Sequence, residues 1–182
     1  MSVFSSIDRR ILAIALPSIV SNITVPLLGL VDVAVTGHMG ADGDTVGALP
    51  ASYYVGAIAV GGMLFNIIYW MFGFLRMGTG GETAQAWGRR DLDGVVLLLV
   101  RSLLLALVLA LVLMALSPLV RDGALWYIAP EAEVASLART YFNICIWGAV
   151  PALGLFAMNG WYIGMQNSRF PMIVAIGQNL LN

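Results

Sequence analysis

The side chain with the clearest capacity for chemistry is Asp32, which ends a stretch without other charges that begins at Ile11. A carboxylate inside a membrane span costs a few kcal/mol, so it usually faces a cavity and has a function there. A proton and a cation can compete for such a carboxylate, which is the chemistry that an antiporter needs. The alternative is an acid close enough to the interface to be solvated. At ~100° per residue, one stripe of the helix combines this acid with small and hydroxyl residues: Ser18, Ser21, Gly29 and Thr36.

Asparagine side chains provide further polar groups inside the predicted spans. Asn179 and Asn182 are three residues apart and therefore share one helix face. Two amides and a carboxylate that faces them, such as Asp32, would form an oxygen-lined site suited to a hard cation such as Na⁺. Three more amides could line a polar cavity or join helices by hydrogen bonds, and for each one alone we favour the hydrogen bond between helices. They are Asn66, Asn143 and Asn159.

Proline and glycine mark points where spans bend or pack closely. Pro17, Pro26 and Pro151 lie inside spans, where each removes a backbone donor and can kink its helix. In transporters such breaks expose carbonyl groups at binding sites, although neighbouring helices can equally accommodate a proline. Gly160 and Gly164 form a GxxxG pair that favours close helix packing.

The remaining reactive residues do not form an enzyme active site. The chain has one histidine, His38, and one cysteine, Cys145, and the cysteine lies in an apolar run. No serine or cysteine has a histidine partner at membrane depth, and no carboxylates pair within a span. The nine basic residues are all arginine and do not cluster, so the sequence does not predict a nucleic-acid partner either.

The elements that must position these groups are transmembrane helices. Of the 182 residues, 60% are hydrophobic and only 10% are charged, whereas soluble domains carry about a quarter charged residues. The gaps between charges are long enough to cross a bilayer, which takes roughly 20 residues. We predict a single all-α, polytopic membrane domain over residues 1–182, with helices near 11–37, 52–76, 95–118, 139–165 and a further helix from 170 to the last residue, 182. We expect a glycine-rich inner loop over 78–94 and a short interfacial helix within 121–138.

Arginine placement predicts the orientation. Arginine is enriched in cytoplasmic loops, and a cytoplasmic N-terminus puts most of the loop arginines on that side. Arg76 and Arg101 then lie at inner ends of spans, where they can reach the headgroups. Glu82 falls in the predicted inner loop and is expected to pair with Arg89 or Arg76.

Four segments along the whole chain carry familiar motifs: Ala15–Pro17 with Pro26–Asp32 and Gly37–His38; Phe74–Gly78 with Thr83–Gly88; Gly164–Pro171; and Asn179–Asn182. In this order and spacing they resemble the first helix, the connection between the second and third helices, the loop after the fourth helix and the start of the fifth helix of multidrug and toxin extrusion (MATE) transporters. The resemblance is closest to the DinF-like bacterial branch.

This resemblance implies a fold of twelve helices in two six-helix bundles, of which the chain would supply about four and a half from the N-terminal bundle. It implies secondary active efflux of organic, often cationic, amphipathic compounds in exchange for H⁺ or Na⁺. Asp32 occupies the place of the first-helix acid that is linked to coupling-ion binding, and Asn182 that of an asparagine on the fifth helix. We therefore expect Asp32, Asn182 and Asn179 to bind the coupling ion, with Asp32 and Asn182 as ligands if the ion is Na⁺.

The resemblance also suggests partners and location. Ser21, Thr36 and Asn159 are candidates for lining the substrate cavity. No cofactor beyond the coupling ion is expected. The partners would be small organic amphipathic substrates, membrane lipid, and a C-terminal half or complementary chain. The location would be the bacterial inner (cytoplasmic) membrane, crossed several times from a cytoplasmic N-terminus.

Two other functions stay open. A lipid-linked oligosaccharide flippase of the same superfamily should place several Arg or Lys residues in its cavity, whereas here the arginines lie at helix ends. A chain with this incomplete set of helices could also be a non-transporting fragment or scaffold.

Overall fold

The computed structural model of the chain describes residues 12, 15–16, 19, 30–31, 34–35 and 49–181. In residues 49–181 the elements are helices without strands: α2 (Ala51–Met71), α3 (Gly73–Gly88), α4 (Leu92–Ile128), α5 (Ala132–Cys145), the 3₁₀ segment η1 (Ile146–Gly148), α6 (Ala149–Gly164) and α7 (Arg169–Leu181). This confirms the predicted all-α fold class.

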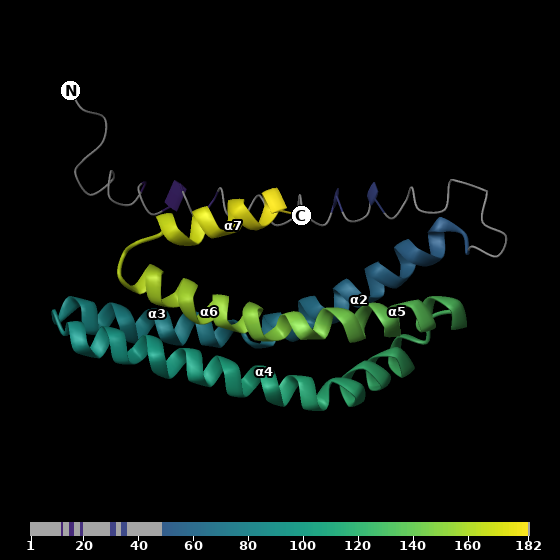
Figure 1. The fold of residues 1–182 in the computed structure, drawn as a ribbon, viewed down its shortest axis with the longest axis horizontal. Coiled ribbons are helices and arrows are strands. Elements are labelled where there is room, and N and C mark those ends of the chain that lie inside the picture. The colour runs from purple at the N-terminus through teal and green to yellow at the C-terminus, as the bar shows by residue number, and fades with distance from the viewer. Residues whose placement is uncertain are drawn as a thin grey trace, which may run out of the picture.

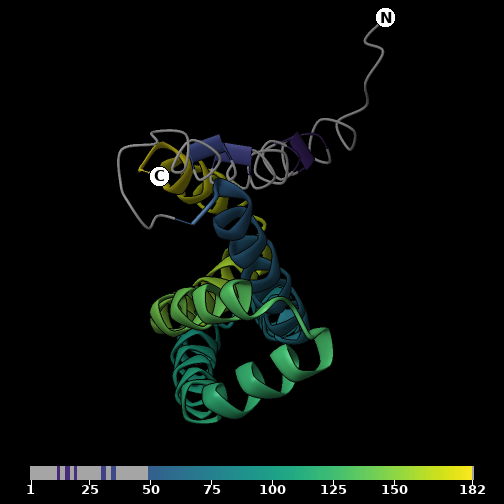
Figure 2. The ribbon, with the colours of Figure 1, turned by 90° about the vertical axis from the view of Figure 1, so that its right-hand side faces the viewer.

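Three continuous runs are long and apolar enough to span a membrane. Ala51–Gly88 has 38 residues, Leu92–Ile128 has 37 and Ala132–Gly164 has 33. The three runs lie side by side along the long axis, and α7 lies on the side of α6 away from α4 (Figure 1, Figure 2). They correspond to the second, third and fourth predicted spans, and each is longer than predicted.

The predicted inner loop over 78–94 is wrong for most of its length. α3 continues to Gly88, so only Arg89, Arg90 and Asp91 connect it to α4. The carboxylate of Asp91 ends the turn, because its Oδ1 accepts a hydrogen bond from the Gly94 amide at 2.9 Å and caps α4. The predicted short helix within 121–138 is also wrong: α4 extends to Ile128, and α5 begins at Ala132.

Gly80, one of the glycines that suggested a loop, lies where α3 and α6 approach each other, and a Cβ atom on it would lie 3.2 Å from the carbonyl oxygen of Gly160. A Cβ atom on Gly164 would lie 2.7 Å from the carbonyl oxygen of Gly80 and 2.7 Å from the Cβ of Thr83. A Cβ atom on Gly160 would overlap the carbonyl group of Arg76. The GxxxG pair therefore packs α6 against α3 within the chain, and this packing overrides the low helix propensity of glycine.

Proline changes two of the long runs. Pro118 lies inside α4 and cannot donate to the carbonyl oxygen of Met114, which instead accepts a hydrogen bond from the Ser117 hydroxyl at 2.8 Å. Pro151 lies in the first turn of α6, directly after the 3₁₀ segment η1. The expected interruption at Pro151 is thus a short change of helix type, while Pro17 and Pro26 lie outside the described residues.

Three groups of buried side chains hold the runs together, and the smallest of them joins α2, α4 and α5 through Ala57, Leu125 and Ala138. Phe65 of α2 stacks on Phe142 of α5 with ring centroids 4.8 Å apart, beside Leu113 of α4. The second group joins α3, α4 and α6 and consists of Leu75, Ala106, Ala110, Leu153 and Ala157. A hydrogen bond of 2.8 Å from the Trp161 indole to the Val95 carbonyl oxygen adds a polar tie between α6 and the start of α4.

Candidate functional site

A cavity of about 660 Å³ lies where α2 passes into α3. The interruption at Phe72 separates the two helices, and the cavity spans it, with α6 contributing one wall. Its lining combines aromatic rings, a thioether, an amide and a guanidinium group: Asn66, Tyr69, Trp70, Gly73, Phe74, Arg76, Met77 and Phe156. The cavity is therefore amphipathic.

Aromatic rings give the cavity its shape. Phe156 of α6 packs edge-on against Tyr69 of α2, with ring centroids 6.2 Å apart and an angle of 74° between the planes. Trp70 is 83% exposed, so nearly the whole indole is free to contact a ligand. Rings arranged in this way can stack on a planar ligand or attract a cation to their faces.

Two polar side chains accompany these rings. Asn66 and Arg76 are exposed, and neither has a hydrogen-bond or ion-pair partner among the residues described. The amide of Asn66 can donate and accept, while the guanidinium of Arg76 can only donate. The cavity can therefore fix the orientation of an amphipathic molecule that carries a hydrogen-bond acceptor or an anionic group.

Sequence reasoning missed this cavity because it ended the second span at Arg76. With the helix ended there, Arg76 reads as an interfacial anchor, whereas α3 in fact continues to Gly88. The available signal was a stripe at helical spacing, with Asn66, Tyr69, Gly73 and Met77 three or four residues apart. The stripe is recognisable only when the glycine-rich segment is included in the helix.

The predicted coupling-ion site cannot be assembled from the described residues. Asp32, Ser21, Thr36 and Asn182 lie outside them, and Asn179 is described only as part of the α7 backbone. Asn159 is half-buried on α6, and it follows the cavity-lining Phe156 by three residues, so the two share one helix face. The roles of all six in ion or substrate binding stay predictions. Within residues 49–181, no group of three or more His, Cys, Asp or Glu side chains could hold a metal ion.

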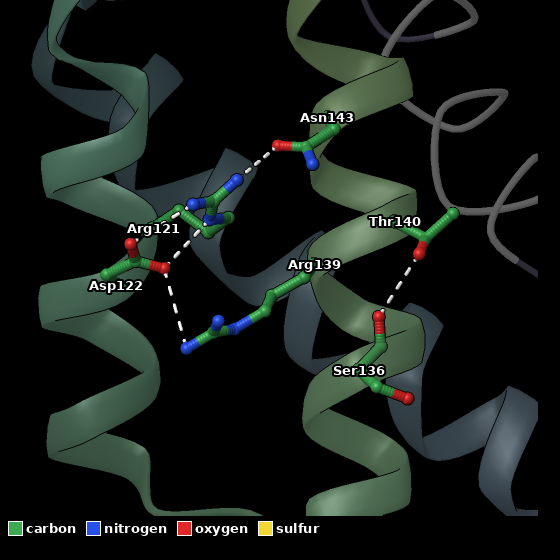
Figure 3. A network of polar contacts seen from close by, with 6 residues as sticks. All are labelled: Arg121, Asp122, Ser136, Arg139, Thr140 and Asn143. Carbon is green, nitrogen blue, oxygen red and sulfur yellow. Dashed lines mark hydrogen bonds and ion pairs between the residues drawn. The ribbon is translucent and has the colours of Figure 1, made fainter.

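A second polar cluster joins α4 to α5 (Figure 3). Arg121 donates to both carboxylate oxygens of Asp122, at 2.9 and 3.1 Å, and its third donor reaches the Asn143 side-chain oxygen at 2.5 Å. Arg139 of α5 lies 3.6 Å from the same carboxylate. Of the three amides expected to tie helices together or line a cavity, Asn143 is thus a tie, while Asn66 lines the cavity.

The fold and the cavity define a polytopic helical membrane protein with an amphipathic cavity at a helix break. The sequence profile of the family described as MatE matches residues 17–182, so the chain belongs to the MatE family. This confirms the resemblance found in the sequence motifs.

Relatives agree with this assignment. The chain is 37% identical, over all of its 182 residues, to DNA damage-inducible protein F of Escherichia coli strain K12, and the match covers 38% of that protein. Over 97% of this chain it is 27% identical to the probable multidrug resistance protein NorM of Thermotoga maritima, covering 36% of that relative. Over 91% it is 26% identical to the protein of the same name from Bradyrhizobium diazoefficiens, covering 33%. The chain thus spans less than two fifths of these relatives. No solved structure matches it significantly.

Proposed function

We propose that the chain forms the N-terminal part of a secondary active multidrug efflux transporter that exchanges H⁺ or Na⁺ for organic, often cationic, compounds. Support comes from the MatE family, from relatives named as probable multidrug resistance proteins, and from membrane-spanning helices. The observation that carries the proposal is the amphipathic cavity at the break between α2 and α3. Broken helices commonly form the substrate sites of secondary transporters.

The lining of the cavity suits compounds of varied structure. Trp70 and Tyr69 offer ring faces to flat or cationic groups, and Met77 adds a flexible, polarizable wall. Arg76 opposes a bare cation and favours a molecule that also carries an acceptor group. The substrates would therefore be amphipathic molecules that contact rings on one side and a polar group on the other.

Coupling to the ion would run through the residues predicted from the sequence. Asp32, with Asn179 and Asn182, would bind H⁺ or Na⁺, and Ser21, Thr36 and Asn159 would line the adjoining cavity. An ion on Asp32 can drive substrate release only by binding more tightly to one conformation than to the other. The location would be the bacterial inner membrane with the N-terminus in the cytoplasm. Lipid and a C-terminal half or complementary chain would complete the transporter.

A lipid-linked oligosaccharide flippase is the second candidate. A pyrophosphate-linked lipid calls for several cationic side chains, but the described cavity contains a single arginine, Arg76. That composition favours the drug exporter. A non-transporting scaffold remains the outcome if no substrate moves.

The test compares efflux by the full-length product of the gene in proteoliposomes. Trp70→Ala should reduce efflux of an aromatic dye severalfold, because stacking of two aromatic rings contributes about 1 kcal/mol. Trp126→Ala is the matched control, because Trp126 on α4 is 82% exposed and does not line the cavity. Equal efflux by the two variants would remove the cavity from the transport path.

A further inference from the structure

A second hollow, of about 200 Å³, lies between α3 and α4 and is lined by residues 74–82 of α3 and 98–105 of α4. Its floor is apolar, with Phe74 and Leu105 among the lining residues. Its polar groups are Glu82 of α3 and Arg101 of α4, together with the hydroxyls of Thr79 and Ser102. We call this hollow the α3–α4 groove.

The two charges of the groove are not used within the described part of the chain. Glu82 forms no ion pair there, so the expected pairing with Arg89 or Arg76 is wrong. Arg101 has no hydrogen-bond or ion-pair partner in residues 49–181 either. Both side chains are exposed at the groove, while the Ser102 hydroxyl already donates to the Leu99 carbonyl oxygen at 3.0 Å. A negative and a positive group thus stand open in one hollow.

The depth of these charges matches the headgroups of a bilayer. A helix of 37 residues such as α4 is about 56 Å long. The hydrocarbon core is about 30 Å thick, so a centred helix projects about 13 Å beyond the core at each end. Glu82 lies about 9 Å from the end of α3 and Arg101 about 14 Å from the start of α4, at 1.5 Å per residue. Both charges therefore reach the boundary between core and headgroups.

We propose that the α3–α4 groove binds a zwitterionic phospholipid with a primary ammonium group, that is, phosphatidylethanolamine. Arg101 binds its phosphate, and Glu82 accepts hydrogen bonds from its ammonium group. One acyl chain lies against Phe74 and Leu105, which are 55% and 47% exposed. This inference requires only that the chain lies in a membrane and does not depend on transport.

Charge complementarity distinguishes this lipid from its neighbours in a bilayer. Phosphatidylglycerol carries the phosphate but no ammonium group, so it leaves Glu82 unpaired next to a net negative ligand. Phosphatidylcholine has a quaternary ammonium that cannot donate a hydrogen bond to a carboxylate. The groove therefore ranks phosphatidylethanolamine above both.

Native mass spectrometry of the full-length gene product in detergent micelles tests the proposal, with each of the three lipids added at the same concentration. The wild type should bind phosphatidylethanolamine about tenfold more tightly than phosphatidylglycerol, because one charge-assisted hydrogen bond changes an affinity by about that factor. Glu82→Gln should remove that preference while phosphate binding persists. Arg101→Gln should weaken all three lipids about tenfold.

Control variants separate the groove from general surface charge. Arg89→Gln and Glu133→Gln each remove one exposed charge outside the groove and should leave the lipid ranking unchanged. Circular dichroism shows whether each variant stays helical, and Glu82→Asp, which keeps the charge, should keep the preference. Equal binding of the three lipids to wild type would overturn the proposal. The proposal would also be overturned if the groove variants and the control variants changed lipid binding equally. That result is expected if another helix fills the groove.

Discussion

Replacing Gly164 by alanine should push α6 away from α3. The added Cβ would lie 2.7 Å from the Gly80 carbonyl oxygen and 3.1 Å from the Ala84 amide nitrogen. Both are backbone atoms, which cannot rotate away as a side chain would. The helices must therefore separate by roughly 0.5–1 Å, which forfeits a quarter to a half of each dispersion contact across the gap.

The magnitude follows from two opposing effects. Overpacking of this kind costs about 1–3 kcal/mol. Alanine in place of a helical glycine recovers about 0.5–1 kcal/mol. Gly164→Ala should therefore lower the free energy of unfolding by up to about 2.5 kcal/mol, with a central value of about 1 kcal/mol, and the bulkier Gly164→Val should lower it by more.

Gly154 provides the matched control on the same helix. A Cβ there meets nothing within 4 Å, so Gly154→Ala should show only the propensity gain of about 0.5–1 kcal/mol. Both variants can be unfolded reversibly in mixed micelles by titrating a denaturing detergent, with tryptophan fluorescence as the signal. If Gly164→Ala proves as stable as Gly154→Ala, the close contact of α3 and α6 does not exist as described.

Three further substitutions test other local contacts. Asp91→Ala removes the cap of α4 and should lower the free energy of unfolding by about 1 kcal/mol in the same titration, whereas Asp93→Ala, which caps nothing, should cost less. Ser117→Ala leaves the Met114 carbonyl oxygen without its donor and should cost about 1–3 kcal/mol, measured as a shift of the unfolding midpoint; no shift would mean that water replaces the hydroxyl. Arg121→Gln breaks the link between α4 and Asn143, so amide hydrogen exchange should accelerate in α5 but not in α3, and unchanged exchange in α5 would refute the tie.

The sequence predicts the helical architecture well, because burying charge in a bilayer is costly and the gaps between charges therefore mark the spans. Helix ends are harder to predict from such gaps. Hydrogen bonding along α3 and α4 continues past charged residues such as Glu82 and Asp122, whose side chains reach water or a partner.

Glycine caused the largest error for a physical reason. The helix propensity of an isolated segment argues against a helix through Gly78, Gly80 and Gly81. α6 packs closely on that helix at Gly80, through Gly160 and Gly164, which lie about eighty residues later in the chain. The tie between Arg121 and Asn143, 22 residues apart, likewise depends on how α4 and α5 turn back on each other. The cavity around Arg76 was not predicted, because the second helix was predicted to end at Arg76. The predicted ion-binding residues around Asp32 rest on the sequence and the family resemblance.

The most direct test of the proposed function is ion-coupled efflux by the full-length gene product, wild type beside Asp32→Asn, in proteoliposomes under an imposed H⁺ gradient and then a Na⁺ gradient. Both proteins should fold alike, as circular dichroism can check. The wild type should expel an amphipathic dye under one of the two gradients, and Asp32→Asn should expel none. Gradient-dependent efflux of undiminished rate by Asp32→Asn would contradict the coupling role of this acid, and the absence of efflux by the wild type under either gradient would contradict the transporter itself.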